Sequence, residues 1–140
     1  MSYEVVIKTS CDSAHRLLKY EGQCHSLHGH FYSIQISIES DELDSNGFVL
    51  DFTVLKKVVV SWINEFWDHG TLLNQDDPLF NILTDMQCKV FAFLDDPTAE
   101  HMCYYLYYKV VSVISKIDDR LRVNYVRIDE TPGSFAYYRR

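Results

Sequence analysis

Residues 24–40 have the sequence CHSLHGHFYSIQISIES, which joins a cluster of histidines to a clear alternating pattern. From Phe31 onward, every second side chain is apolar. The apolar positions are Tyr32, Ile34, Ile36 and Ile38, and the polar ones are Ser33, Gln35, Ser37 and Glu39. A period of two is typical of a half-buried antiparallel strand, so this stretch predicts a strand with one face against a core.

The residues on either side of this strand predict a second strand and a helix. Residues 3–10 alternate more weakly and favour a first strand, whereas the polar stretch 40–47 favours a turn. Asp51 is a suitable helix N-cap, and helical spacing of apolar residues behind it predicts a helix to about Trp67. These apolar residues are Val54, Leu55, Val58, Val59, Trp62, Ile63 and Phe66.

The second half of the chain predicts another helix and further strands. Residues 70–96 are irregular, and Asp96-Pro97-Thr98 provides a cap and a proline that a helix start tolerates. The expected elements are a short strand at Val90–Leu94, a helix over Ala99–Ile117, and strands over Leu121–Glu130 and Phe135–Tyr138.

The main elements follow the order β-β-α-α-β-β. This order predicts a single α+β domain over residues 1–140, with an antiparallel sheet and both helices on one face. Such a sheet has free edges unless it closes or pairs between subunits, so we expect a homo-oligomer.

The composition excludes several classes of function. The chain carries a net charge of −7 without a basic stripe, so we expect no nucleic-acid partner. Its apolar runs are too short to span a bilayer, and no secretory signal is visible, so we expect a cytoplasmic protein. Thiols stay reduced there, and Cys88 and Cys103 are expected to be buried as apolar side chains.

Three histidines form a candidate metal site. His28 and His30 are two residues apart at the start of a predicted strand, so their side chains point to the same face. His15 ends the first strand and would lie beside them in an antiparallel pair. Three imidazoles with a vacant fourth position suit a catalytic Zn²⁺. The alternative is that His-Gly-His is a turn and His15 a surface residue.

Cys24 lies just before these histidines, and its spacing leaves its role open. It could be a fourth ligand that closes a structural zinc site. It could instead be a free thiol beside a metal-bound substrate, activated by local positive charge to act as a base. Inert burial is the third interpretation.

Two further groups are candidates for chemistry. Asp68 and His69 follow the first helix and could form a proton relay in which the carboxylate fixes the imidazole tautomer. Adjacent Asp and His also occur by chance at helix ends. Glu130 ends the third long strand and could anchor the 2-amino group and ring N–H of a pterin or guanine, although such glutamates are usually just solvated.

Taken together, these segments resemble the 6-pyruvoyltetrahydropterin synthase/6-carboxytetrahydropterin synthase family over essentially the whole chain. The matching segments are Ser13-Ala14-His15-Arg16, the Cys-x₃-His-Gly-His run from Cys24, Gly47–Phe52, Trp67–Asn74, Asp96–Glu100, and Glu130-Thr131-Pro132.

This resemblance implies a T-fold subunit that assembles into a hexamer of two trimers, with active sites at subunit interfaces. It implies that Zn²⁺ is bound by His15, His28 and His30, and that Cys24 is the catalytic thiol with Asp68 and His69 as its partners. Glu130 corresponds to the pterin anchor, with Thr98 and Glu100 near the same pocket.

The resemblance also implies a reaction. Three residues between Cys24 and His28 match the bacterial carboxytetrahydropterin synthases. These enzymes convert 7,8-dihydroneopterin triphosphate to 6-carboxy-5,6,7,8-tetrahydropterin, acetaldehyde and triphosphate, for 7-deazaguanine and queuosine synthesis. The candidate triphosphate partners are Arg16, Lys19, Arg139 and Arg140.

Two other functions stay open. One is a 6-pyruvoyltetrahydropterin synthase, and the other is a catalytically silent zinc- and pterin-binding protein. Two features differ from the family pattern. Cys11 stands where the family often has Phe, and the segment 75–94 is long enough to carry an added loop or strand.

Overall fold

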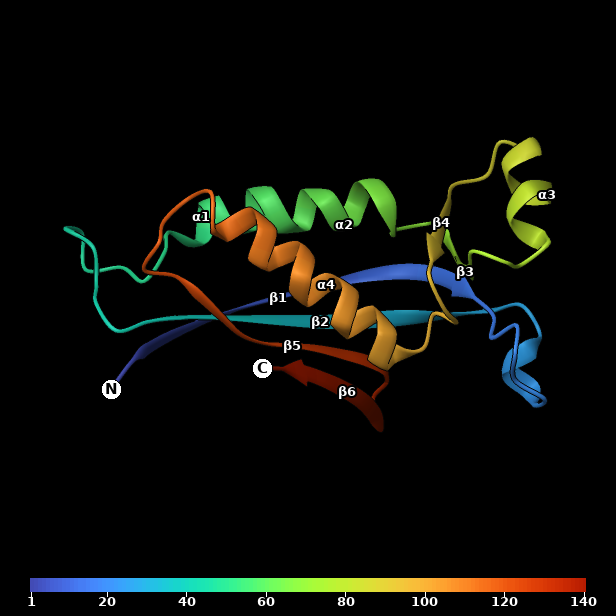
Figure 1. Ribbon diagram of the computed structural model, residues 1–140, viewed down its shortest axis with the longest axis horizontal. Helices are drawn as coiled ribbons and strands as arrows, with labels where there is room; N and C mark the ends of the chain where they lie inside the picture. The colour runs from blue at the N-terminus through green and yellow to red at the C-terminus, as the bar shows by residue number, and fades with distance from the viewer.

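The two longest strands, β1 (Tyr3–His15) and β2 (His28–Ser40), pair antiparallel along their whole lengths (Figure 1). The structure, a computed structural model, describes residues 1–140. Its further elements are η1 (Gln23–His25), α1 (Phe52–Leu55), η2 (Lys56–Val60), α2 (Ser61–Phe66), β3 (Thr71–Asn74), α3 (Leu79–Asp85), β4 (Val90–Phe93), α4 (Ala99–Ile114), β5 (Arg122–Thr131) and β6 (Ser134–Arg139).

The β1–β2 pair is longer than the sequence predicts. β1 continues beyond residue 10 to His15, and β2 begins at His28 rather than Phe31. Polar residues such as Ser13 and His30 hide the alternation there, but the same ladder continues through them. The register pairs His15 with His28 and Ser13 with His30. The prediction that His15 lies beside the second strand is therefore confirmed.

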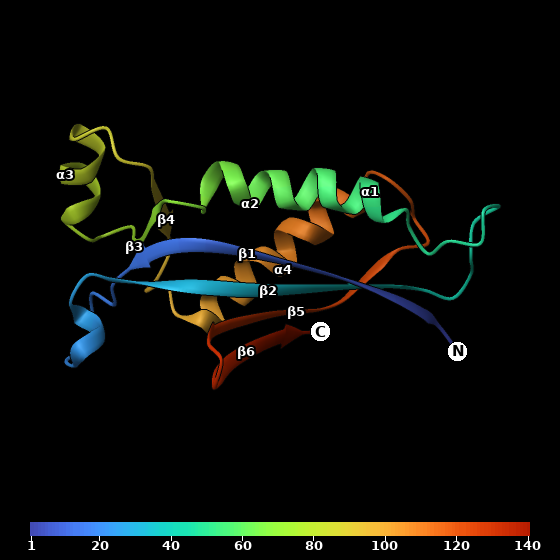
Figure 2. The ribbon, with the colours of Figure 1, turned by 180° about the vertical axis from the view of Figure 1, so that it is seen from behind.

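The sheet has six strands in the order β4-β3-β1-β2-β5-β6. The expectation of an antiparallel sheet is wrong in one part, because β3 pairs with β1 and β4 pairs with β3 in parallel. β4 was expected at nearly these residues, but β3 and α3 were not. A four-residue strand is too short for a period to be visible in the sequence. Together β3, α3 and β4 form the end of the molecule beyond β1 (Figure 2).

The predicted helix behind Asp51 forms as three consecutive segments. Asp51 caps it as expected, accepting a hydrogen bond of 2.8 Å from the N–H of Thr53. In the middle, η2 is a π-helical turn. The buried side chains, Leu55, Val59, Ile63 and Trp67, recur every four residues. In a regular α-helix, with 3.6 residues per turn, side chains four residues apart would gradually rotate away from the sheet. The wider π turn corrects this rotation and keeps all four side chains facing the sheet.

Both long helices cover one face of the sheet, as expected (Figure 1). Side chains of α4, such as Met102 and Leu106, and of β2, such as Ile34 and Ile36, share one buried core. Thr98 is the N-cap of α4, accepting a hydrogen bond of 3.1 Å from the N–H of His101. None of the helices is long and apolar enough to cross a membrane.

Candidate active site

The structure brings His15, His28 and His30 together at the end of the β1–β2 pair. One ring nitrogen from each histidine lies within 4.8 Å of the others. The Nε2 atoms of His15 and His28 are 3.0 Å apart. His15 is buried, with 1% of its surface exposed, whereas the other two are partly exposed. The hairpin register produces this cluster, because facing residues of an antiparallel pair share one side of the sheet.

Backbone carbonyl groups orient two of these imidazole rings. Nδ1 of His15 lies 2.9 Å from the carbonyl oxygen of Pro97, and Nδ1 of His28 lies 2.7 Å from that of Ser26. Only a protonated Nδ1 can donate to a carbonyl, so in its neutral form each ring would direct the lone pair of Nε2 toward the other. Burial, and then the neighbouring histidines, lower the pKa of His15 to about 4, which keeps this ring neutral.

This arrangement fits a cation held between the rings. Two Nε2 lone pairs that face each other at 3.0 Å repel unless a proton or a metal ion lies between them. The carbonyl contacts that fix both Nδ1–H groups are the usual outer contacts of metal-binding histidines. A set of three nitrogen donors suits Zn²⁺ and related transition metals, and donor chemistry does not distinguish among these metals.

Cys24 opens into a cavity beside this cluster. The cavity has a volume of about 180 Å³, and its walls include His15, Cys24, Thr98, Glu100 and Glu130. We call it the Cys24 pocket. All three residues expected to bind substrate therefore line it, together with the expected thiol and one expected metal ligand.

The carboxylate of Glu130 is free for a ligand. Its Oε1 lies 3.7 Å from Nε2 of His15 and 3.9 Å from Nε2 of His30, and it accepts no hydrogen bond from the protein. Its side chain is about one third exposed, at 31%. A carboxylate that lines a cavity and accepts no hydrogen bond from the protein can accept two N–H donors from a flat heterocycle.

Asp68 and His69 form a hydrogen-bonded pair, but this pair lies outside the Cys24 pocket. Nδ1 of His69 is 2.8 Å from Oδ2 of Asp68, and the other carboxylate oxygen accepts a bond of 3.0 Å from the N–H of Asp12. The Asp12 N–H first, and then His69, hold the pKa of Asp68 below its ordinary value. Asp68 is thus an anion that favours the Nδ1–H tautomer of His69.

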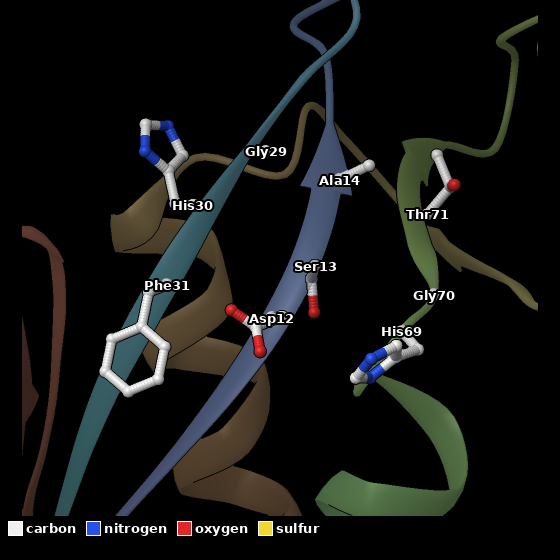
Figure 3. Close-up of a pocket in the computed structure, with 9 residues that line it drawn as sticks. All are labelled: Asp12, Ser13, Ala14, Gly29, His30, Phe31, His69, Gly70 and Thr71. Carbon is white, nitrogen blue, oxygen red and sulfur yellow. The ribbon is translucent and has the colours of Figure 1, made fainter.

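His69 lines a wide cavity of about 500 Å³ with Asp12, Gly29 and Phe31 (Figure 3). We call it the His69 cavity. It shares no residue with the Cys24 pocket, although His30 of the histidine cluster is also in its wall. Asp12 and Phe31 alternate with residues of the histidine cluster, so they point to the opposite face of the sheet. Within one chain, the structure therefore does not bring the Asp68–His69 pair to Cys24.

None of the four candidate triphosphate partners lines either cavity. Arg16 is bound to Asp77, and Lys19 is bound to Asp95. Arg139 lies over the ring of Tyr137, and Arg140 lies in a groove beside α4. The sequence also did not point to Pro97 and Ser26, because they act through backbone carbonyl groups that any residue could supply.

Comparison with known proteins identifies the family. A family model described as 6-pyruvoyl tetrahydropterin synthase matches residues 4–140. The chain belongs to this family. It is therefore an enzyme of the tetrahydropterin synthase family, and the resemblance found in the sequence is confirmed.

Individual relatives agree with this family. A 6-carboxy-5,6,7,8-tetrahydropterin synthase of Rickettsia felis is 31% identical over 128 residues, which cover 89% of this chain and 91% of the relative. The enzyme of the same name from Haemophilus influenzae is 29% identical and covers 97% of this chain and 98% of its own.

Solved structures support the T-fold. A protein of Wolinella succinogenes matches with a TM-score of 0.84 at 23% identity, covering 99% of this chain and 98% of its own. The 6-pyruvoyl tetrahydropterin synthase of Plasmodium falciparum matches with a TM-score of 0.74 at 20% identity, with the same coverage of both chains. The expected α+β T-fold is confirmed, with β3 as a strand that the sequence did not predict.

Proposed function

We propose that this chain is a zinc-dependent 6-carboxy-5,6,7,8-tetrahydropterin synthase acting on 7,8-dihydroneopterin triphosphate. The observation that carries the proposal is the Cys24 pocket, in which a thiol, a carboxylate that accepts no hydrogen bond from the protein and a histidine of the metal cluster share one cavity. The relatives from Rickettsia felis and Haemophilus influenzae carry this enzyme name. The proposed setting is the cytoplasm, in a pathway to 7-deazaguanines such as queuosine.

His15, His28 and His30 would hold the zinc ion. Bound there, zinc would polarise the hydroxyl oxygens of the substrate side chain and favour negative charge on them. The protein prepares this site with the carbonyl groups of Pro97 and Ser26, which fix the two closest rings. Because His15 stays neutral under physiological conditions, its lone pair is available without loss of a proton.

Glu130 and Cys24 would act on the two ends of the substrate. The carboxylate of Glu130 accepts the 2-amino group and a ring N–H, which directs the side chain at C6 toward the histidine cluster. Thr98 and Glu100 line the same cavity and limit how the ring can lie. Cys24, acting as a thiolate, takes and returns a proton at the carbon atoms of that side chain.

The Asp68–His69 pair would supply the second proton carrier. It lies in the His69 cavity, which includes His30 but none of the residues of the Cys24 pocket, so in this proposal a second subunit brings it to Cys24. The free edges at β4 and β6 leave the sheet open to such an assembly. We therefore propose a homo-oligomer, a hexamer of two trimers, in which each site takes Cys24 from one subunit and His69 from another.

The decisive experiment is incubation of the zinc-loaded protein with 7,8-dihydroneopterin triphosphate. We expect carboxytetrahydropterin, identified by mass, with an equal amount of acetaldehyde and triphosphate. Chelation should stop the reaction, and re-addition of zinc should restore it. Cys24→Ala should lower kcat by about 100-fold or more, the usual contribution of a general base. Cys88→Ala is the matched control, because that thiol is exposed and lies outside both cavities.

Other outcomes would replace this proposal. A pyruvoyl product without acetaldehyde would identify a 6-pyruvoyltetrahydropterin synthase with the same site. Binding of zinc and pterin without turnover would identify a silent binding protein, and the proton-transfer roles of Cys24 and His69 would then be wrong.

A further inference from the structure

Lys89 contacts the turn that carries the Asp68–His69 pair. Its Nζ donates a hydrogen bond of 2.7 Å to the carbonyl oxygen of Asp68 and one of 3.0 Å to that of Asn64. Its carbonyl group accepts a bond of 3.0 Å from the N–H of Thr71. Lys89 comes directly before β4, in the segment that the sequence marked as unusually long. This segment therefore contacts the end of α2 through Lys89.

The turn needs such support because its backbone is strained. His69 has a φ of 58°, in the left-handed region that residues with a side chain adopt at a cost of about 1 to 2 kcal/mol. The His69 N–H donates a bond of 2.7 Å to the carbonyl oxygen of Asp12. This bond and the one from Asp12 to the Asp68 carboxylate fix the turn on the side of β1. A strained conformation persists only where several contacts specify it.

Lys89 supports the turn from its other side. Asn64 lies in the last turn of α2, and Asp68 lies just beyond it. Carbonyl groups at the end of a helix lack partners, and a cation is favoured there. The methylene groups of Lys89 also lie under Gly70, where an added Cβ would come within 3.1 Å of its Cδ. Glycine at this position therefore lets the lysine stem pass close beneath the backbone.

We propose that Lys89 is a positioning residue for the proton relay, which it holds in place through the backbone of Asp68. This inference rests on the proposed function, in which the Asp68–His69 pair moves a proton. Lys89 does not touch substrate in this scheme. It fixes the direction of the imidazole, because His69 would point away from the Asp68 carboxylate if its backbone could relax from a φ of 58°.

The test compares Lys89→Met, which keeps the stem and removes the amine, with Lys89→Arg, which keeps a cationic donor. The matched control is Lys116→Met, since Lys116 is an exposed lysine just after α4 whose amine makes no hydrogen bond or ion pair. In Lys89→Met we expect kcat to fall by about 10- to 100-fold while KM changes by less than about 3-fold. Lys89→Arg should recover most of kcat, and the control should match the wild type.

A second measurement needs no substrate. ¹⁵N NMR of the His69 ring reports its tautomer, with the signal assigned from a His69→Asn sample. The wild type should be mainly the Nδ1–H form, because Nδ1 contacts Asp68. The share of this form should fall in Lys89→Met and return in Lys89→Arg. If Lys89→Met does not fold, the same two measurements are made on Lys89→Gln.

The outcomes separate this inference from the proposed function. Unchanged kcat and an unchanged tautomer in Lys89→Met would overturn it, and so would a loss that arginine does not restore. If the wild type itself fails to convert the substrate, the proposed function is wrong, and the tautomer alone decides the role of Lys89.

Discussion

Arg16 donates two hydrogen bonds of 2.6 Å to the carboxylate of Asp77, one from Nε and one from Nη2. Asp77 is buried, with 3% of its surface exposed, and it also accepts a bond of 2.9 Å from the N–H of Leu79 where α3 begins. A bidentate pair of this kind fixes a planar geometry and uses the Nε–Nη2 edge of the guanidinium for a contact within the fold. Arg16 therefore holds the fold together next to His15.

Replacing Arg16 by Met should destabilise the protein without weakening substrate binding. Removing one partner leaves a buried charge uncompensated, which costs about 3 kcal/mol. We expect that loss in the free energy of unfolding, measured with urea, and an unchanged KM. Lys19→Met is the control, because the Lys19–Asp95 pair is exposed and should contribute less than about 1 kcal/mol. A raised KM in a stable Arg16→Met protein would contradict this role.

The same pair sets a pH dependence. Burial alone would raise the pKa of Asp77, but hydrogen bonds from Arg16 and Leu79 outweigh it, and the net pKa lies below its ordinary value. A lowered pKa in the folded state stabilises the protein above about pH 4, and this contribution is lost as the pH falls further. The difference in stability between wild type and Arg16→Met should therefore shrink below about pH 4 in urea titrations.

Each histidine of the cluster should be needed for metal binding. We expect one Zn²⁺ per chain in the wild type and a loss of affinity of about 100-fold or more in His15→Ala, His28→Ala and His30→Ala. Zinc at about 100 times its Kd should raise the free energy of unfolding by about 2.7 kcal/mol. His25→Ala is the control, because His25 lies in the same segment but outside the cluster. Equal loss in His25→Ala would contradict the assignment.

His69→Gly should make the protein more stable and less active. Glycine adopts the φ of 58° without the strain of a Cβ, so we expect a gain of about 0.5 to 1 kcal/mol. Loss of the imidazole should lower kcat by about 100-fold or more. Gln87→Gly is the matched control, since Gln87 has a φ of 63° and lines neither cavity. It should gain similar stability with kcat unchanged.

The histidine cluster was predictable because hydrophobic alternation fixes the register of the β1–β2 pair. Once Tyr32, Ile34 and Ile36 face the core, His28 and His30 must share their face, and the hairpin brings His15 opposite His28. The parallel strand Thr71–Asn74 was not predictable. Its four residues show no period, and its pairing with β1 depends on where α2 ends.

The separation of the two cavities also could not be predicted from the sequence. Cys24 and the Asp68–His69 pair were assigned to one site from family motifs, which record which residues a reaction needs but not from which subunit each comes. The position of Lys89 depends on α3 and β4, and nothing in its immediate sequence distinguishes it from any surface lysine.

The four thiols should separate into two classes. Burial raises the pKa of Cys11 to about 11 and that of Cys103 to about 12, whereas Cys88 is exposed and Cys24 partly so. The expectation that Cys88 is buried is therefore wrong, and that for Cys103 is confirmed. At pH 8 a thiol reagent should modify two cysteines quickly and two only after unfolding, since thiolate is the reactive form. Cys24→Ala should lose one fast thiol; four equally fast thiols would contradict the buried positions.

Mixed subunits should test whether the active site is shared between chains. Cys24→Ala and His69→Gly should each be nearly inactive alone, because each lacks one of the two proposed proton carriers. If Cys24 and His69 of one site come from different subunits, co-assembled variants contain some sites with neither substitution. Equal amounts of the two variants would be unfolded and refolded together. If the subunits mix at random and the shared sites act independently, we expect kcat per subunit to rise to roughly a quarter of the wild-type value. Mixing without refolding is the control. Mass spectrometry should verify the mixed oligomers, and an absence of recovery in them would place both groups of each site in one chain.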